Sequence, residues 1–188
     1  LSIAPYWYDV NDNKKTWTNK QIVQRSCGKF RREWESSSMK DKSYTPENYP
    51  ILRYGDVLLM LAEAENEAHQ GPTDLAYECI NEIRQRAGIS KLEGLSYTDF
   101  QQAVRDERAR ELCFESLRKY DLVRWGIYVE AVHDKLGAAT QDKRWATGNQ
   151  FIGARDYAAR TQEKHQFLPI PTKELDVNGK LEQNKYWQ

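Results

Sequence analysis

Long apolar runs are what this sequence lacks most clearly. The longest, Val57 to Ala62, is about a third of the roughly 18 residues that a membrane-spanning helix needs, so no such helix is expected. Net charge is also missing, because 28 Lys and Arg residues balance 28 Asp and Glu residues. A phosphate-binding surface usually requires a basic excess, so nucleic acid is not an expected partner.

Cysteine and histidine are too few, and too scattered, for the common metal and redox sites. Cys27, Cys79 and Cys113 are an odd number without a CxxC pair, so neither a disulfide framework nor a zinc site is expected. Cys79 and Cys113 fall on apolar helical faces and are expected to be buried. A di-iron bundle needs two Glu-x-x-His motifs, and Glu130 with His133 is the one match. No HExxH, GxSxG, GxxxxGK or GxGxxG motif occurs, so we expect no metal, no cofactor and no catalytic residues.

What the sequence does contain is helical periodicity from Pro50 onward. Apolar residues recur at three- and four-residue steps, and Gly and Pro interrupt them. The pattern predicts a mainly α fold of tetratricopeptide-like helical hairpins joined to long loop-rich segments. The expected helices cover about 50–70, 73–88, 97–117 and 121–136.

Capping residues refine the ends of these helices. Thr73 is expected to cap the second helix, and Gly88 to end it in the left-handed conformation. Thr98 with Gln101 suggests a capping box for the third helix, which would begin near Ser96 or Thr98. Asp121 is expected to cap the fourth helix.

The remaining segments have no sustained period. We expect a short strand or two within 21–34 and a short helix around 155–164. Nearly fifty irregular residues at one end are unusual for a compact domain. We therefore expect 1–48 to be a loop-rich segment of a larger N-terminal part that is missing here, and 49–188 to be a helical domain.

Two carboxylates lie on the apolar face of the third predicted helix, where Phe100, Ala103, Val104 and Phe114 are also expected. Glu107 and Glu111 are one turn apart, which is compatible with carboxylate-based glycoside hydrolysis. An unpaired buried carboxylate costs several kcal/mol, however, and arginines are abundant nearby. Structural ion pairing is the favoured interpretation, with expected participants Glu107, Glu111, Arg118, Asp121 and Arg124.

Aromatic residues are plentiful, with six Trp, eleven Tyr and five Phe. Aromatic faces stack on the apolar C–H faces of sugars, and neighbouring polar groups such as Asp9 and Asn11 hydrogen-bond the hydroxyls. The candidate ligand-binding residues are Tyr6, Trp7, Tyr8, Trp17, Trp34 and Trp145.

Four blocks of the chain resemble, in the same order, the C-terminal half of SusD/RagB proteins. They are RYGDVLLMLAEAENE (Arg53–Glu67), INEIRQRAG (Ile80–Gly88), DERARELCFESLRKYDLVRWG (Asp106–Gly126), and FLPIPTKELDVN with LEQNKYW (Phe167–Asn178, Leu181–Trp187). Four blocks in register are far more specific than one. The resemblance covers about 48–187, and members of that family are several hundred residues long.

The resemblance implies a surface-exposed lipoprotein of the Gram-negative outer membrane, of the Bacteroidetes type. Such proteins form a lid on a TonB-dependent SusC-like transporter and capture oligosaccharides or other nutrients without cleaving them. The only membrane attachment expected is an N-terminal lipid anchor that this chain does not include. The shared blocks belong to the scaffold, so no ligand residue is carried over.

Two alternatives stay open at this point. One is a glycoside hydrolase that uses Glu107 and Glu111. The other is a helical scaffold that binds partner peptides in the groove between its helices, although this alternative accounts poorly for the aromatic-rich N-terminal segment.

Overall fold

A computed structural model describes residues 4, 6–9, 11, 13–18, 25, 27–36, 45–139 and 149–188. The backbone contacts divide the chain into two units, which are described separately here. The first comprises 1–17 and 25–118, and the second comprises 18–24 and 119–188. This division falls within the range 49–188 that the sequence assigns to one helical domain.

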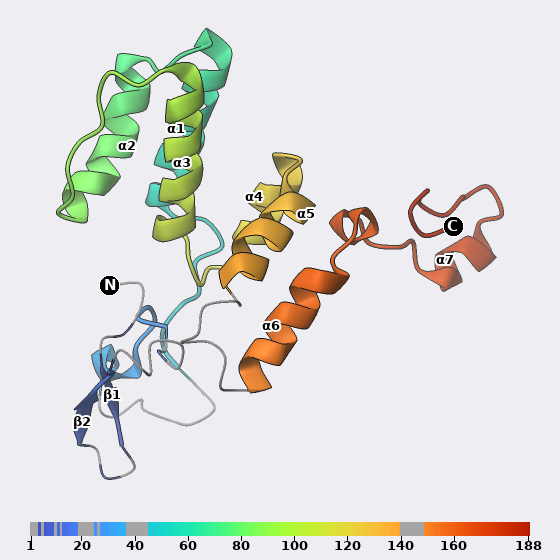
Figure 1. Cartoon of the computed structure of the whole chain (residues 1–188), viewed down its shortest axis with the longest axis horizontal. Helices are drawn as coiled ribbons and strands as arrows, with labels where there is room; N and C mark the ends of the chain where they lie inside the picture. Colours follow the sequence, from blue (N-terminus) through green and yellow to red (C-terminus); the bar gives the residue numbers. More distant parts are fainter. Residues whose placement is uncertain are drawn as a thin grey trace. The chain divides into compact units, whose positions relative to one another are not determined.

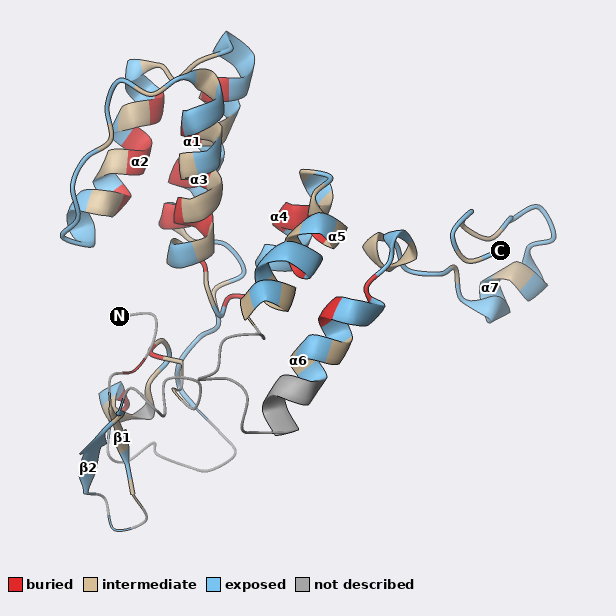
Figure 2. Cartoon of the chain, in the orientation of Figure 1, coloured by how far each residue is buried: buried red, intermediate tan, exposed pale blue. Residues whose placement is uncertain are grey.

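Three helices form the core of the first unit: α1 (Tyr54–His69), α2 (Asp74–Arg86) and α3 (Tyr97–Glu111). Figure 2 shows that their buried positions face one another. The core consists of apolar residues at helical spacing, namely Leu58, Leu59, Ala62, Ala76, Cys79, Ile80, Ile83, Phe100 and Val104. The predicted pair of adjacent helices before Gly88, and the mainly helical fold, are confirmed (Figure 1).

The ends of α1 and α2 follow local chemistry. Thr73 caps α2 as predicted, since its side chain accepts a hydrogen bond from the Ala76 backbone N–H. Gly88 has φ of +73°, the left-handed geometry predicted for the end of this helix. At the end of α1 the left-handed residue is Gln70, directly before Gly71.

The third predicted helix begins where α3 does, near residue 97, but its cap and its C-terminal end differ. Its cap is Ser96, whose side chain accepts from the Asp99 backbone N–H, so the predicted box of Thr98 with Gln101 is wrong. The helix ends at Glu111, six residues before the predicted end at Leu117. Phe114 has a positive φ of 65° and is 50% exposed, so its predicted place on the apolar face is also wrong. The turn breaks the periodicity because Glu115 reaches back to pair with Arg53.

The fourth predicted helix, 121–136, is three segments in the second unit: α4 (Arg118–Arg124), α5 (Tyr128–Ala131) and the π-helix η4 (Val132–Gly137). Asp121 lies inside α4, so its predicted role as N-cap is wrong. The break follows from Gly126, with φ of +70°. Its N–H donates to the Val123 carbonyl and the next N–H donates to the Leu122 carbonyl, the pattern of a Schellman helix end.

The rest of the second unit contains α6 (Asn149–Arg160), the short 3-10 helix η6 (Glu163–Gln166) and α7 (Thr172–Val177). The short helix predicted near 155–164 thus corresponds to the end of α6 and the start of η6. A small core joins α4, α5, η4 and α6 through Leu122, Tyr128, Val132 and Ala158. In the described parts of the chain, no helix is long and apolar enough to cross a membrane.

The first unit also contains a two-stranded antiparallel sheet, β1 (Tyr6–Tyr8) and β2 (Lys14–Thr16), in which Trp7 is paired with Lys15. Aromatic residues suit β1, and Asp9 closes the turn because its carboxylate accepts the N–H groups of Asn11 and Asn13. The strands predicted within 21–34 are wrong for the described part of that range, which contains an isolated bridge at Cys27 and a 3-10 helix, η2 (Arg32–Trp34).

Candidate functional site

The β-hairpin brings four of the candidate aromatic residues together. Trp7 stacks on Trp17 with ring centroids 5.5 Å apart, and Tyr8 meets the edge of Tyr6 at 5.9 Å. Tyr8 is 46% exposed, whereas the other three rings are half-buried. Within the described residues, the buried Nε1–H of Trp17 has no acceptor. Tyr8 is therefore the most accessible stacking surface of the hairpin.

Arg31 links this hairpin to Trp34 at the end of η2. Its guanidinium carbon lies 4.2 Å from the Tyr6 ring centroid and 5.7 Å from the Trp34 ring centroid, both within cation–π range. Lys14 also lies over the Tyr6 ring, at 3.7 Å. Because two cations occupy its ring surface, Tyr6 is better suited to holding Arg31 in place than to stacking on a ligand.

Glu33 completes the arrangement around Arg31. It accepts a hydrogen bond of 2.8 Å from the Tyr6 hydroxyl and an ion pair of 2.7 Å from Arg31. The Tyr6 hydrogen bond and the charge of Arg31 together outweigh partial desolvation and lower the pKa of the Glu33 carboxyl. Glu33 therefore stays ionised at neutral pH and fixes the cation between the two rings.

Trp34 also lines a cavity of about 870 Å³ in the first unit. Trp34 is 64% exposed, and many of the other residues that line the cavity are charged. The cavity is within the size range of small-molecule sites. The lining residues used below are Lys29, Phe30, Trp34, Glu47, Arg86 and Arg110.

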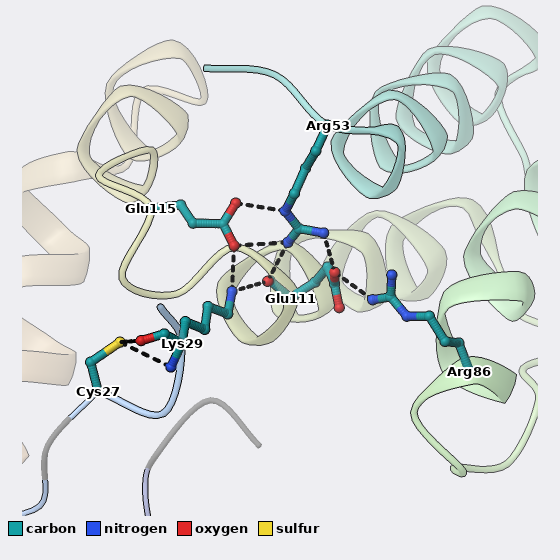
Figure 3. Close-up of polar contacts among 6 residues, drawn as sticks. All are labelled: Cys27, Lys29, Arg53, Arg86, Glu111 and Glu115. Carbon is teal, nitrogen blue, oxygen red and sulfur yellow. Dashed lines mark hydrogen bonds and ion pairs between the residues drawn. The ribbon is translucent and has the colours of Figure 1, made fainter. Parts of the chain in front are cut away.

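A network of charges closes one wall of this cavity (Figure 3). Arg53, the residue before α1, lies between Glu111 and Glu115: Nε donates to Glu115 Oε2 at 2.7 Å and Nη1 to Glu111 Oε1 at 2.5 Å. Lys29 also pairs with Glu115 and donates to the Glu111 backbone carbonyl at 2.6 Å. Arg86 pairs with Glu111 from the other side, at 2.5 Å. The network therefore ties the 27–36 segment to the ends of all three helices.

The same network sets the protonation of its two acids. Burial alone would raise the pKa of Glu111, but hydrogen bonds from Arg86 and Arg53 outweigh it and hold the pKa below its ordinary value. Burial alone would also raise the pKa of Glu115, but hydrogen bonds from Arg53 and Lys29 outweigh it and hold the pKa below its ordinary value. A glycosidase acid needs a raised pKa so that it is protonated near neutral pH. Glu111 has the opposite environment.

Glu107, the other carboxylate of the predicted pair, is 3% exposed and accepts a 2.8 Å hydrogen bond from Arg84 on α2. Arg110 is 3.7 Å from the same oxygen. The residue after Glu107, buried Arg108, donates to Asp56 of α1 at 2.8 Å. Both acids on the apolar face of α3 thus meet arginines from other helices.

The other proposed ion-pair residues have more local contacts. Asp121 and Arg124 pair within α4 at 3.0 Å. Arg118 donates to the Arg105 backbone carbonyl at 3.0 Å. Cys79 is buried as predicted, whereas Cys113 is half-buried. Trp145 lies outside the described residues, so its role stays a prediction.

Sequence reasoning missed four members of this site, Lys29, Arg31, Arg53 and Glu115. Arg53 and Glu115 do occur within the quoted sequence blocks, but their contact joins residues 62 positions apart. Helical periodicity carries no information on such pairs. In the described ranges, no three His, Cys, Asp or Glu residues are grouped in a way that could hold a metal ion.

An exposed indole next to a polar, charge-lined cavity, on a helical scaffold, is typical of a ligand-binding protein. A family model described as the SusD family matches residues 4–187, almost the whole chain. The protein belongs to the SusD family, as the four sequence blocks predicted. SusD family proteins are non-catalytic binding proteins and outer-membrane surface lipoproteins.

Two curated relatives come from Formosa agariphila. SusD-like protein P25 is 40% identical over 139 residues, which make up 72% of this chain and 23% of the relative. SusD-like protein P2 is 29% identical over 148 residues, or 73% of this chain and 25% of the relative. The chain therefore spans about a quarter of the length of these relatives.

Solved structures support the fold. A SusD homolog from Bacteroides thetaiotaomicron has a TM-score of 0.76 and 32% identity, and the match covers 98% of this chain and 39% of that one. A SusD superfamily protein from Bacteroides vulgatus has a TM-score of 0.53 and 31% identity, with 72% and 27% covered. The predicted SusD-like fold is confirmed.

Proposed function

We propose that this protein captures oligosaccharides, or other nutrients, at the Gram-negative cell surface and delivers them uncleaved to a TonB-dependent SusC-like transporter. Membership of the SusD family supports the class of function. An N-terminal lipid anchor outside this chain would hold the protein on the outer membrane. The ligand and the transporter are parts of the proposal.

The observation that carries the proposal is the position of Trp34. Its indole is 64% exposed and lines the cavity of the first unit. A flat aromatic face accepts the apolar side of a pyranose ring. The guanidinium of Arg86 and the exposed carboxylate of Glu47 line the same cavity and offer a hydrogen-bond donor and an acceptor to sugar hydroxyls. Tyr8 adds a second ring, linked to Trp34 through Tyr6 and Arg31.

The chemistry of the two acids argues against hydrolysis. Cleavage of a glycoside needs one protonated and one ionised carboxyl group on either side of the bond. Glu111 has a lowered pKa and two arginine partners, and Glu107 is 3% exposed, so neither is free to donate a proton to a substrate. Capture without cleavage is the function that this arrangement supports.

The test compares binding of the purified protein to a panel of neutral and acidic polysaccharides by affinity electrophoresis, followed by calorimetry on the strongest. Trp34→Ala is expected to weaken binding about tenfold, since stacking contributes roughly 0.5–1.5 kcal/mol beyond area burial. Tyr120→Ala is the matched control, because Tyr120 is 71% exposed but lies outside both described cavities. It should leave binding unchanged.

Two outcomes would overturn the proposal in different ways. If no polysaccharide retards the wild-type protein, sugars are not the ligand. If the wild type binds and Trp34→Ala binds equally well, capture is real but this cavity is not where it occurs. Release of reducing ends from any bound polysaccharide would contradict capture without cleavage.

A further inference from the structure

The second unit contains its own cavity, of about 430 Å³, which is distinct from the site proposed above. Four elements of that unit contribute side chains to it: α4, α5, α6 and η6, together with the strand-like segment after η6 and Trp187 near the C-terminus. Its volume is in the range of sites for small ligands, roughly 300–1,000 Å³. The lining residues that matter here are Tyr128, Asp156, Tyr157, Arg160, His165 and Phe167.

The apolar part of this cavity is preorganised. Tyr128 is 2% exposed, and its hydroxyl is hydrogen-bonded to that of Tyr157 on α6. Trp187 is fixed because its Nε1–H donates to the backbone carbonyls of Lys164 and Phe167, at 3.1 and 3.0 Å. Tyr157 and Phe167 nevertheless remain 49% and 47% exposed, so ring surface is available to a ligand.

The polar part keeps hydrogen-bonding capacity. Asp156 and Arg160 lie one turn apart on α6, and their closest atoms are 4.0 Å apart, which is too long for a hydrogen bond. His165 Nδ1 accepts the Gln162 backbone N–H at 2.8 Å, so the neutral ring carries its proton on Nε2, a donor. Burial and the contact with Tyr157 raise the pKa of Tyr128 to about 12, so its hydroxyl stays protonated. An acceptor and several donors therefore surround the exposed rings.

From this geometry we propose that the cavity beside Tyr157 is a second saccharide-binding site, which takes one or two sugar units of a neutral glycan. Tyr157 and Phe167 stack on the ring, while Asp156 accepts from hydroxyls and Arg160 with His165 donates to them. The choice of a sugar as the ligand class rests on the proposed function. The site itself rests on residues that the first cavity does not share.

Two sites on one chain have a measurable consequence. A short oligosaccharide fills either site alone and shows two binding events per chain. Removing one site should therefore leave a single binding event per chain.

The experiment uses the purified protein and the polysaccharide panel above, with the matching trisaccharides. Five proteins are compared: wild type, Asp156→Asn with Tyr157→Ala, Tyr157→Phe, Trp34→Ala, and the combination of Asp156→Asn, Tyr157→Ala and Trp34→Ala. The variant of the second site is expected to lower the calorimetric stoichiometry for the trisaccharide from two to one. Tyr157→Phe keeps the ring and should retain stacking, and circular dichroism checks that each variant is folded.

The failures can be told apart. If Trp34→Ala abolishes binding and the second-site variant matches wild type with every ligand, the proposed function stands and the second site is refuted. A stoichiometry of one for the wild type refutes it as well. If wild type binds none of the panel, both the second site and the proposed function are overturned.

Discussion

Replacing Arg53 by Met should destabilise the first unit, because the carboxylates of Glu111 and Glu115 lose a buried cationic partner. Arg53 makes four hydrogen bonds, two to Glu115, one to the Glu111 side chain and one to the Glu111 backbone. The side chains of Glu111 and Glu115 are 13% and 5% exposed, so water replaces little of what is lost. Methionine keeps much of the volume and removes only the charge and its donors.

The size of this destabilisation depends on which partners Glu111 and Glu115 keep when Arg53 is removed. Breaking a buried ion pair by removing one partner costs about 3–5 kcal/mol. Here Lys29 still pairs with Glu115 and Arg86 with Glu111, and Arg53 itself is 24% exposed. We therefore expect a loss at or below the lower bound of that range, about 2–3 kcal/mol in the free energy of unfolding at neutral pH.

Acid should reduce this difference. The folded-state pKa values of Glu111 and Glu115 are lowered, so their stabilising contribution is present above the unfolded glutamate pKa. It is lost as pH falls through the lowered folded values. Around pH 3, where the unfolded acids are protonated, the difference in unfolding free energy between wild type and variant should be smaller than at neutral pH.

Urea unfolding followed by far-UV circular dichroism, at both pH values, measures the effect. Arg110→Met is the control, since Arg110 is on α3 but 61% exposed and should cost about 0.5 kcal/mol or less. A loss for Arg53→Met as small as that of the control, or a gap unchanged by acid, would refute the electrostatic reasoning.

Two further substitutions test the helical scaffold by the same unfolding measurement. Leu59→Ala should lower the free energy of unfolding by about 2–5 kcal/mol because Leu59 is fully buried. Leu61→Ala is the control: Leu61 is two residues further along α1 but 38% exposed, so its loss should be under about 1 kcal/mol. Equal losses for the two variants would contradict the packing of α1. Thr73→Ala removes the acceptor for the Ala76 N–H and should lower the free energy of unfolding by about 1 kcal/mol. Thr73→Ser should restore most of that stability. Unchanged stability in Thr73→Ala would show that the cap contributes nothing.

The parts of the fold that could be predicted depend on local chemistry. Thr73 and Gly88 identify the ends of α2 because a cap needs a side-chain oxygen and a left-handed end favours glycine. The break at Gly126 was not predicted, although it uses the same residue type. Apolar residues continue at helical spacing through Leu122, Trp125 and Val129, so periodicity hides the turn between them.

For the site, the sequence predicts the types of residue that take part better than it predicts which residues contact one another. The apolar face of α3 leads to the expectation that Glu107 and Glu111 need arginines, but it cannot select Arg84 or Arg53, which lie 23 and 58 positions away. The aromatic cluster likewise indicates stacking chemistry, whereas the grouping of Tyr8 with Trp34 depends on Arg31, a residue with no distinguishing sequence signal.

The charge network connects the family scaffold with the proposed ligand site. Lys29 reaches Glu115 and the end of α3, and the chain then continues through Arg31 to the exposed ring of Trp34. Only four residues separate Lys29 from Trp34, and the η2 turn among them is closed by the Trp34 N–H, which donates to the Arg31 carbonyl at 3.0 Å. Breaking the ion pairs of the network would thus allow Trp34 to leave the cavity wall, even though none of the residues changed would contact the ligand. The block from Asp106 to Gly126 carries the family resemblance, and through Glu111 and Glu115 it also contributes to the wall of the proposed ligand site.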